Sequence, residues 1–299
     1  MKRWYIATAK RLSAELRDDL HKHLEGLGME CFIPMQTKTI SMRGREVKRE
    51  MPLALNYVFI RSEDFLSARN MLHNFPQVSM LYNKPYKDAK KDSEESRYRP
   101  MIASDVEMEM FIKAASFYTQ GVPFEVPDRK LMEKGDIVRI IGGPFKGVEG
   151  VLITQQGKDG GKVVVSISNL ISVSTIDIAP EFIQVIKFAH GNKHIYKKMD
   201  SFKPRVEKAL EKQKDGVPLS EEEHSQIEEF IHRFSAVKTE TVNTEAKLSL
   251  LIFKGYRALG MEKQARAYYG KIQEDIFPKV KSEKVKDTLK KELNDFLKK

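Results

Sequence analysis

The segment from residue 136 to residue 186 constrains the fold more than any other part of the chain. It holds several short stretches rich in β-branched residues, and clusters of glycine and polar residues separate them. Short strands at such regular spacing are typical of all-β modules, and the segment is too short for a sandwich of about 100 residues. We therefore expect a small five-stranded β-barrel. The expected strands are 136–141, 147–154, 162–167, 172–176 and 182–186.

The block of residues 119–189, which contains this β-rich segment, carries no net charge, although the chain of 299 residues has a formal net charge of +10. Residues 119–189 hold 8 basic and 8 acidic side chains, whereas residues 1–118 hold 20 and 16, and residues 190–299 hold 24 and 18. The basic excess makes nucleic acid a candidate partner. Two prolines within 121–128 indicate a linker before the expected barrel. The domains expected are 1–118, a linker at 119–131, a barrel at 132–189 and an extension at 190–299.

The N-terminal part is expected to form an α+β domain. Leucines recur every three or four residues from Leu12 to Leu27, which predicts a helix between strands at 3–9 and 31–33. Loose alternation over 36–51 predicts a projecting hairpin. Further strands and a helix then complete the strand–helix–strand–strand–helix–strand order of a ferredoxin-like split βαβ fold. The later elements are strands at 57–60 and 78–81, a helix with Phe65, Ala68, Met71 and Leu72 on one face, and a helix that Ser104 caps and that carries Val106, Met110 and Ala114.

The last 110 residues are expected to be entirely helical. Ser220 followed by three glutamates predicts a capped helix start. Helices are also expected over 246–259 and 261–276, which flank Gly260, and from about residue 282 onward. Tyr256, Gly260, Ala265 and Tyr269 resemble one tetratricopeptide repeat. A single repeat cannot bury its own apolar face, so an ordinary helical hairpin packed against its neighbours is the favoured interpretation.

Residue types suited to catalysis do not gather at recognisable spacings. His21 and His23 lie two positions apart on the first helix and point to different faces, so they cannot share a metal ion. Cys31 is the one cysteine, and no local feature activates its thiol. No apolar core of a signal peptide and no run of about 20 apolar residues is found. We expect a cytoplasmic protein that is not an enzyme, does not enter a membrane and uses no cofactor or metal.

The segment Gly135-Asp136-Ile137-Val138-Arg139-Ile140-Ile141-Gly142-Gly143-Pro144-Phe145-Lys146-Gly147-Val148-Glu149-Gly150-Val151 resembles a KOW motif, which implies an SH3-like barrel. Upstream, Arg3-Trp4-Tyr5-Ile6, the leucine helix, Phe32-Ile33-Pro34, a basic arm and Asn56-Tyr57-Val58-Phe59-Ile60 occur in the order of a NusG N-terminal domain. The chain therefore resembles NusG-family transcription elongation factors over residues 1–189. The motif positions are Gly135, Asp136, Gly143, Pro144, Phe145, Gly147 and Gly150.

The resemblance implies a function without covalent chemistry. NusG-like proteins dock an apolar patch of the N-terminal domain on the clamp helices of RNA polymerase and favour processive elongation. Their KOW domain recruits partners such as a termination factor or the ribosome. An alternative is that Tyr57 simply belongs to the core. The residues to which the resemblance gives the polymerase-binding role are Trp4, Phe32, Pro34, Leu53, Leu55, Asn56 and Tyr57.

Two departures from the family pattern predict a specialised paralogue. Where the family reads Phe-Pro-Gly-Tyr, this chain has Ala54-Leu55-Asn56-Tyr57. The loop that family members use for KOW partners has Ser168, Asn169 and Leu170 in place of the usual aromatic residue. Specialised members act as antiterminators on particular long operons, such as those for surface polysaccharides. The main alternative is an RNA-binding or ribosome-associated KOW protein that does not bind polymerase.

The expected hairpin is rich in basic residues. Such a run is usually a solvated surface, but beside the polymerase cleft it could contact DNA phosphates, which give position and salt dependence without sequence readout. The arm residues concerned are Lys38, Arg43, Arg45, Lys48 and Arg49, against Glu46 and Glu50.

Overall fold

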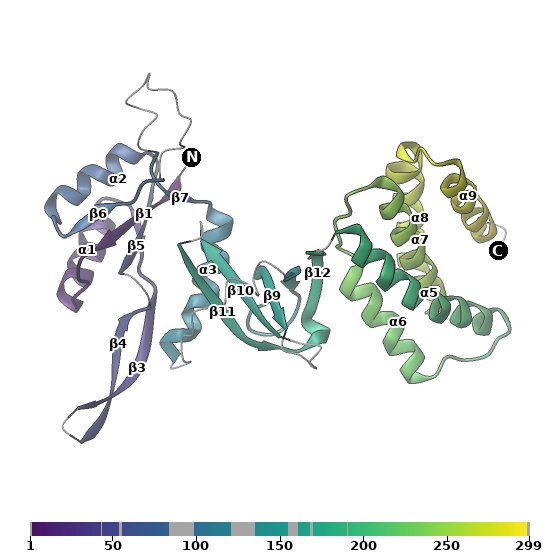
Figure 1. The fold of residues 1–299 in the computed structure, drawn as a ribbon, viewed down its shortest axis with the longest axis horizontal. Coiled ribbons are helices and arrows are strands. Elements are labelled where there is room, and N and C mark those ends of the chain that lie inside the picture. Colours follow the sequence, from purple (N-terminus) through teal and green to yellow (C-terminus); the bar gives the residue numbers. More distant parts are fainter. Residues whose placement is uncertain are drawn as a thin grey trace. The chain divides into compact units, whose positions relative to one another are not determined.

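A computed structural model describes residues 2–42, 44–53, 56–83, 99–120, 135–154, 161–167, 170–189 and 191–297 (Figure 1). Contacts between residues group the chain into two compact units. The first unit comprises Met1–Asp128 and Val163–Ile176, and the second comprises Arg129–Lys162 and Asp177–Lys299. The division into three domains and a linker stays a prediction.

The first unit contains a five-stranded sheet with the order β2-β5-β1-β6, in which β7 pairs with β1 beside Trp4 and Tyr5. The strands pair antiparallel, with α1 between β1 and β2 along the chain and α2 between β5 and β6. This order confirms the split βαβ fold. The elements are β1 (Arg3–Ala9), α1 (Ala14–Gly26), β2 (Glu30–Phe32), β5 (Tyr57–Ser62), α2 (Phe65–Met71), β6 (Val78–Met80) and β7 (Ile102–Ala103).

Successive side chains of β1 and β5 point to opposite faces of the sheet, and both faces are apolar because nearly all of these residues are buried. Tyr5 and Ile60 belong to the core that contains the buried leucines of α1. On the other face, the Phe59 ring packs against Phe111 of α3 (Asp105–Ala115), with ring centroids 5.7 Å apart. Each face of the sheet is therefore covered by helix, which makes this domain's core two-sided.

The helix α3 begins at Ser104 as predicted, with a full capping box in which Glu107 is the partner. Of the apolar residues that the periodicity picked out, Ala114 is buried but Val106 is 60% exposed, and the buried face of the helix also includes Met108 and Phe111. The ring of Phe111 reaches Phe32 and Phe59 on the sheet, and this contact fixes the rotation of the helix.

A second sheet of five antiparallel strands has the order β11-β10-β9-β8-β12. All five predicted strands are present, whereas the closure of the sheet into an SH3-like barrel stays a prediction. Gly143 and Gly147 both have positive φ angles, of 70° and 91°, which glycine adopts without a steric penalty. The strands are β8 (Ile137–Ile140), β9 (Glu149–Thr154), β10 (Gly161–Ile167), β11 (Ile171–Ile178) and β12 (Ile183–Lys187).

The C-terminal part of the second unit is helical, as predicted. Buried side chains of α7 and α9 form its core together with Ala265, Ile272 and Ile276. The described part of the chain holds no helix with both the length and the apolar character needed to cross a membrane. The helices are α5 (Asn192–Lys214), α6 (Glu221–Phe234), α7 (Val242–Ala258), α8 (Glu262–Lys271) and α9 (Glu283–Leu297).

The sequence did not predict α5. This helix contains Pro204 and buries only Ile195, Met199, Val206 and Ala209 among its 23 residues. So sparse an apolar stripe, interrupted by a proline, gives a weak periodic signal. The other helices begin within a few residues of their predicted starts.

Candidate functional site

The predicted arm is a two-stranded antiparallel ribbon made of β3 (Met35–Met42) and β4 (Arg45–Pro52). Its register runs from the pair Met35 and Pro52 at the base to the pair Met42 and Arg45 beside the turn. Gly44 in the turn has a φ angle of 77°. Figure 1 shows the ribbon extending away from the sheet of the first unit, so the predicted hairpin is confirmed.

Hydrogen bonds anchor the base of the ribbon. The buried Gln36 amide nitrogen donates to the carbonyl oxygens of Pro52 at 3.1 Å and Leu53 at 3.0 Å. The Thr37 hydroxyl donates to the Thr119 carbonyl oxygen at 2.7 Å, in the short helix η3 (Ser116–Gln120). The ribbon therefore starts from a fixed base, and its outer part is exposed to solvent.

The register gives the two faces of the ribbon different chemistry, because residues directly opposite each other in an antiparallel pair share a face. One face, called here the basic face, has the pairs Lys38–Arg49, Ile40–Val47 and Met42–Arg45. The other face, the acidic face, has the pairs Thr37–Glu50, Thr39–Lys48 and Ser41–Glu46.

The predicted arm residues therefore do not form a single surface. Lys38, Arg45 and Arg49 share the basic face, which carries no carboxylate among the described residues. Lys48 lies on the acidic face between the positions of Glu46 and Glu50. Arg43 is outside the described residues. Three positive charges without a neighbouring carboxylate on the same face make that face the better surface for a phosphate backbone.

Several residues of the predicted polymerase-binding patch lie in the core of the first unit. Trp4, Leu53 and Tyr57 are 6%, 3% and 7% exposed. Pro34 is buried and Phe32 is half-buried, with its ring 6.3 Å from that of Phe111. Burial raises the pKa of the Tyr57 phenol. Leu55 lies outside the described residues, and the docking role of the whole set stays a prediction.

Asn56 has a φ angle of 51°, in the left-handed region. Asparagine is one of the few residues with a side chain that adopts this conformation readily. The Asn56 carbonyl oxygen accepts from the Ala9 amide nitrogen at 3.0 Å, and its side-chain amide donates to the Lys10 carbonyl oxygen at 3.4 Å. The turn before β5 thus keeps a conformation suited to glycine, the residue that the NusG pattern has at this position.

An ion-pair cluster around Arg61 was not predicted. The Arg61 guanidinium donates to Glu30 at 2.6 Å and to both carboxylate oxygens of Asp105, at 2.9 and 3.0 Å. These bonds link β5, β2 and the first turn of α3, and they lower the pKa of Asp105. The partners lie 31 and 44 residues from Arg61, so no local pattern could reveal them.

The residues of the KOW-like motif hold the turn between β8 and β9. A Cβ atom on Gly135 would lie 2.4 Å from the Leu152 carbonyl oxygen, so only glycine fits there. Asp136 accepts a hydrogen bond from the Ala189 amide nitrogen at 2.9 Å, and Phe145 is fully buried. Gly150 lies opposite Val138, and Pro144 lies in the turn.

The predicted partner loop of the motif is only partly described. The Leu170 amide nitrogen donates to the Ile167 carbonyl oxygen at 2.8 Å. Ser168 and Asn169 lie outside the described residues. The recruiting role of this loop therefore stays a prediction.

Within the second unit, the helical extension packs against the edge strand β12. The Gln184 amide donates to the His232 carbonyl oxygen at 3.0 Å and to the Ser235 hydroxyl at 3.2 Å. The Lys238 amide nitrogen donates to the Ile186 carbonyl oxygen at 2.7 Å. These bonds join the second sheet to α6 and the residues that follow it.

Groups suited to covalent chemistry are few in the described ranges. Burial raises the pKa of the Cys31 thiol to about 12, so it is protonated near neutral pH and is a poor nucleophile. Among the residues with a described position, no three histidine, cysteine, aspartate or glutamate side chains gather as metal ligands would.

Residues 2–111 match the family model described as "Transcription termination factor nusG". No curated protein matches the chain. Matching solved structures include a chain from the "Crystal Structure of MjSpt4:Spt5 complex conformation B", at 14% identity and a TM-score of 0.19, covering 62% of this chain and 97% of that chain.

Proposed function

The chain carries a NusG-family N-terminal domain over residues 2–111, and from this premise we propose that it is a transcription elongation factor that binds RNA polymerase through this domain. NusG-family proteins are transcription factors and not enzymes. The match spans both strands of the arm and the whole first sheet. The family match to this domain is the observation that carries the proposal.

The arm supports a finer proposal, contact with nucleic acid in the polymerase complex. Lys38, Arg45 and Arg49 project from one face of a ribbon with an anchored base. A ribbon this narrow can approach a duplex or a single strand closely, and its charges would displace counterions from the phosphates. The contact would strengthen binding without reading the base sequence.

We further propose that the factor acts on particular operons as an antiterminator. The loop after β10 lacks the family's aromatic residue, and α6 is bonded to β12 at one edge of the second sheet. Both features alter the surfaces through which a KOW domain would recruit partners. The helical extension is the part of this chain that could supply a substitute partner surface.

Capture of core RNA polymerase by the full-length chain tests the proposal that the protein is a polymerase-binding elongation factor. We expect the tagged protein to retain purified core enzyme and to raise the transcribed length on a pause-rich template. Retention of ribosomes or free RNA with no retention of core polymerase would contradict it and favour the alternative of a ribosome-associated protein.

Transcript profiling after deletion tests the proposal of operon-specific antitermination, which requires loss of distal genes in a few operons. A genome-wide loss of transcripts would contradict operon specificity.

A further inference from the structure

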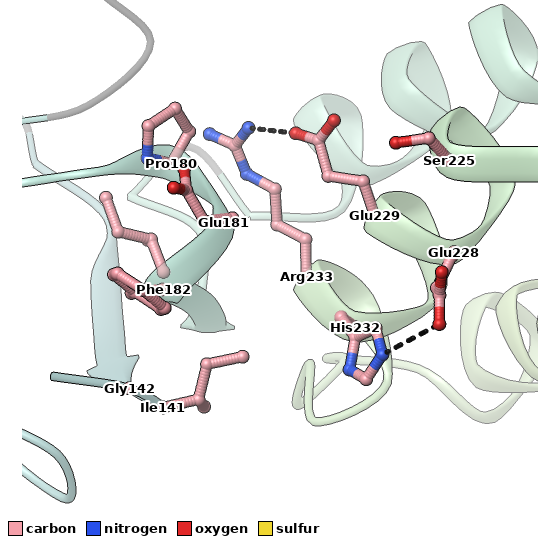
Figure 2. A pocket seen from close by; sticks show the side chains of 11 residues that line it. Ile141, Gly142, Pro180, Glu181, Phe182, Ser225, Glu228, Glu229, His232 and Arg233 are labelled. Atoms are coloured by element: carbon pink, nitrogen blue, oxygen red, sulfur yellow. Dashed lines mark ion pairs between the residues drawn. The ribbon is translucent and has the colours of Figure 1, made fainter. Parts of the chain in front are cut away.

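A groove of about 440 Å³ lies within the second unit, between the end of the second sheet and α6 (Figure 2). One wall consists of Ile141, Gly142 and the short helix η4 (Pro180–Phe182), and the other wall is the polar side of α6. This volume is within the range of ligand-binding clefts, about 300–1,000 Å³. Ile141 and Gly142 lie within the KOW-like segment, but neither the named motif positions nor the proposed polymerase contact uses this groove.

The sheet wall presents a fixed aromatic surface. Phe182 is 40% exposed, although large aromatic side chains are usually covered. A Cβ atom on residue 142 would lie 2.3 Å from the Phe182 ring, so Gly142 is what allows the ring to lie against the backbone. The ring therefore lies against Gly142, and the exposed part of Phe182 is available in the groove beside Ile141.

The α6 wall presents acceptors in excess of cations. Glu228 and Glu229 line the groove, and Glu181 adds a third carboxylate from η4. The cation there is Arg233, whose terminal nitrogen is 3.7 Å from Glu229, and His232 Nε2 is 3.9 Å from Glu228. These separations are too long for strong hydrogen bonds, so the carboxylates keep acceptor capacity for an incoming donor.

Arg233 adds a donor of its own. Its Nε atom is buried and has no hydrogen-bond partner among the described residues. A buried donor without an acceptor is energetically unfavourable.

We propose that this groove binds an extended peptide segment that carries an arginine or lysine beside an apolar side chain. The apolar side chain would cover Phe182 and Ile141, and the cation would meet Glu228 and Glu229. The stem of a lysine or arginine can lie along apolar surface while its charged end reaches the carboxylates, and a cation over the Phe182 ring adds a further attraction. Anionic ligands are disfavoured because three carboxylates line the groove.

Fluorescence polarisation with labelled peptides and the full-length chain tests the proposal. The probe is an octapeptide with one phenylalanine beside two arginines in a glycine–serine background, and the reference peptide has glutamine in place of each arginine. We expect the arginine peptide to bind at least about tenfold more tightly. Double substitution Glu228→Gln/Glu229→Gln should remove that preference, and Phe182→Ala should weaken both peptides.

The matched control is Glu221→Gln/Glu222→Gln, which removes two charges from the same helix at residues that do not line the groove. This variant should bind the arginine peptide as the unchanged chain does. Unchanged amide resonances away from the groove show that each variant is folded. The proposal is overturned by an equal loss in both double variants, by the absence of saturation at about 1 mM peptide, or by displacement of the peptide with single-stranded RNA.

Discussion

In the first unit, the Tyr118 hydroxyl forms the two main-chain hydrogen bonds with Ser174 that a neighbouring strand would otherwise form. It donates to the Ser174 carbonyl oxygen at 2.6 Å and accepts from the Ser174 amide nitrogen at 3.1 Å. Ser174 lies in β11, the last strand at one end of the second sheet. One buried side chain therefore satisfies both main-chain groups of a residue on an edge strand, where such groups would otherwise be open to pairing with another chain.

Replacing Tyr118 with phenylalanine should expose these groups. Tyr118 is 2% exposed, so loss of its hydroxyl leaves polar groups poorly paired, a cost of about 1–3 kcal/mol in local stability. Amide hydrogen exchange at Ser174 should accelerate in Tyr118→Phe. Ser174→Ala keeps both main-chain groups and serves as the control. Equal exchange rates in the unchanged chain and Tyr118→Phe would show that the hydroxyl does not protect the edge.

Because Asn56 has a left-handed backbone conformation, glycine at this position should be more stabilising than a β-branched residue. Asn56→Gly should preserve the melting temperature, because glycine adopts positive φ freely. Asn56→Val should lower it by an amount equivalent to about 1–2 kcal/mol, since a β-branched residue is strained there. Differential scanning calorimetry measures both variants. A valine variant as stable as the glycine variant would exclude the left-handed turn.

The two faces of the ribbon predict different salt dependence for adjacent residues. Arg49→Gln should flatten the dependence of log affinity on log salt for an elongation complex, by up to about 0.9 if one phosphate contact is lost. Lys48→Gln removes the same charge from the acidic face and should leave the slope unchanged. Equal slopes in the two variants would mean that the basic face is not the contacting one. The measurement is the affinity of each variant for an elongation complex on a labelled nucleic-acid scaffold at a series of salt concentrations.

Glu223 predicts a specific acid sensitivity of the helical part. Hydrogen bonds from Lys212 Nζ, at 2.7 and 2.8 Å, and from the Ser220 amide nitrogen lower the pKa of Glu223 to about 2. A carboxylate with a lowered pKa in the folded state contributes stability above its unfolded pKa, and this contribution is lost as the pH falls through the folded value. The contribution should therefore be full above about pH 4.5 and vanish near pH 2.

Thermal unfolding of the unchanged chain and Glu223→Gln between about pH 2 and about pH 7 checks this prediction, because this range runs from the shifted pKa of about 2 to well above the ordinary pKa of 4.5. The difference in melting temperature should be largest at neutral pH and should close as the pH approaches 2. Glu222 accepts a hydrogen bond from Gln226 instead, so Glu222→Gln is the control. A difference that does not change with pH would show that the Lys212 contact is not formed.

Local signals in the sequence determined much of the secondary structure. The helix starts at Ser104 and Ser220, the hairpin around Gly44 and the five strands between residues 137 and 187 all follow from caps, turns and alternation. These signals act within a few residues, so they are present before the chain is folded.

Tertiary structure alone decided which surfaces are buried and which face outward. Tyr57 is covered by the core, Val106 points away from it, and Arg61 finds partners 31 and 44 residues distant. Lys48 and Arg49, by contrast, lie on different faces of the ribbon because neighbouring residues alternate along any strand. Packing depends on contacts between distant segments, because a side chain's exposure is set by what covers it, and the amino-acid pattern around a residue does not specify that partner.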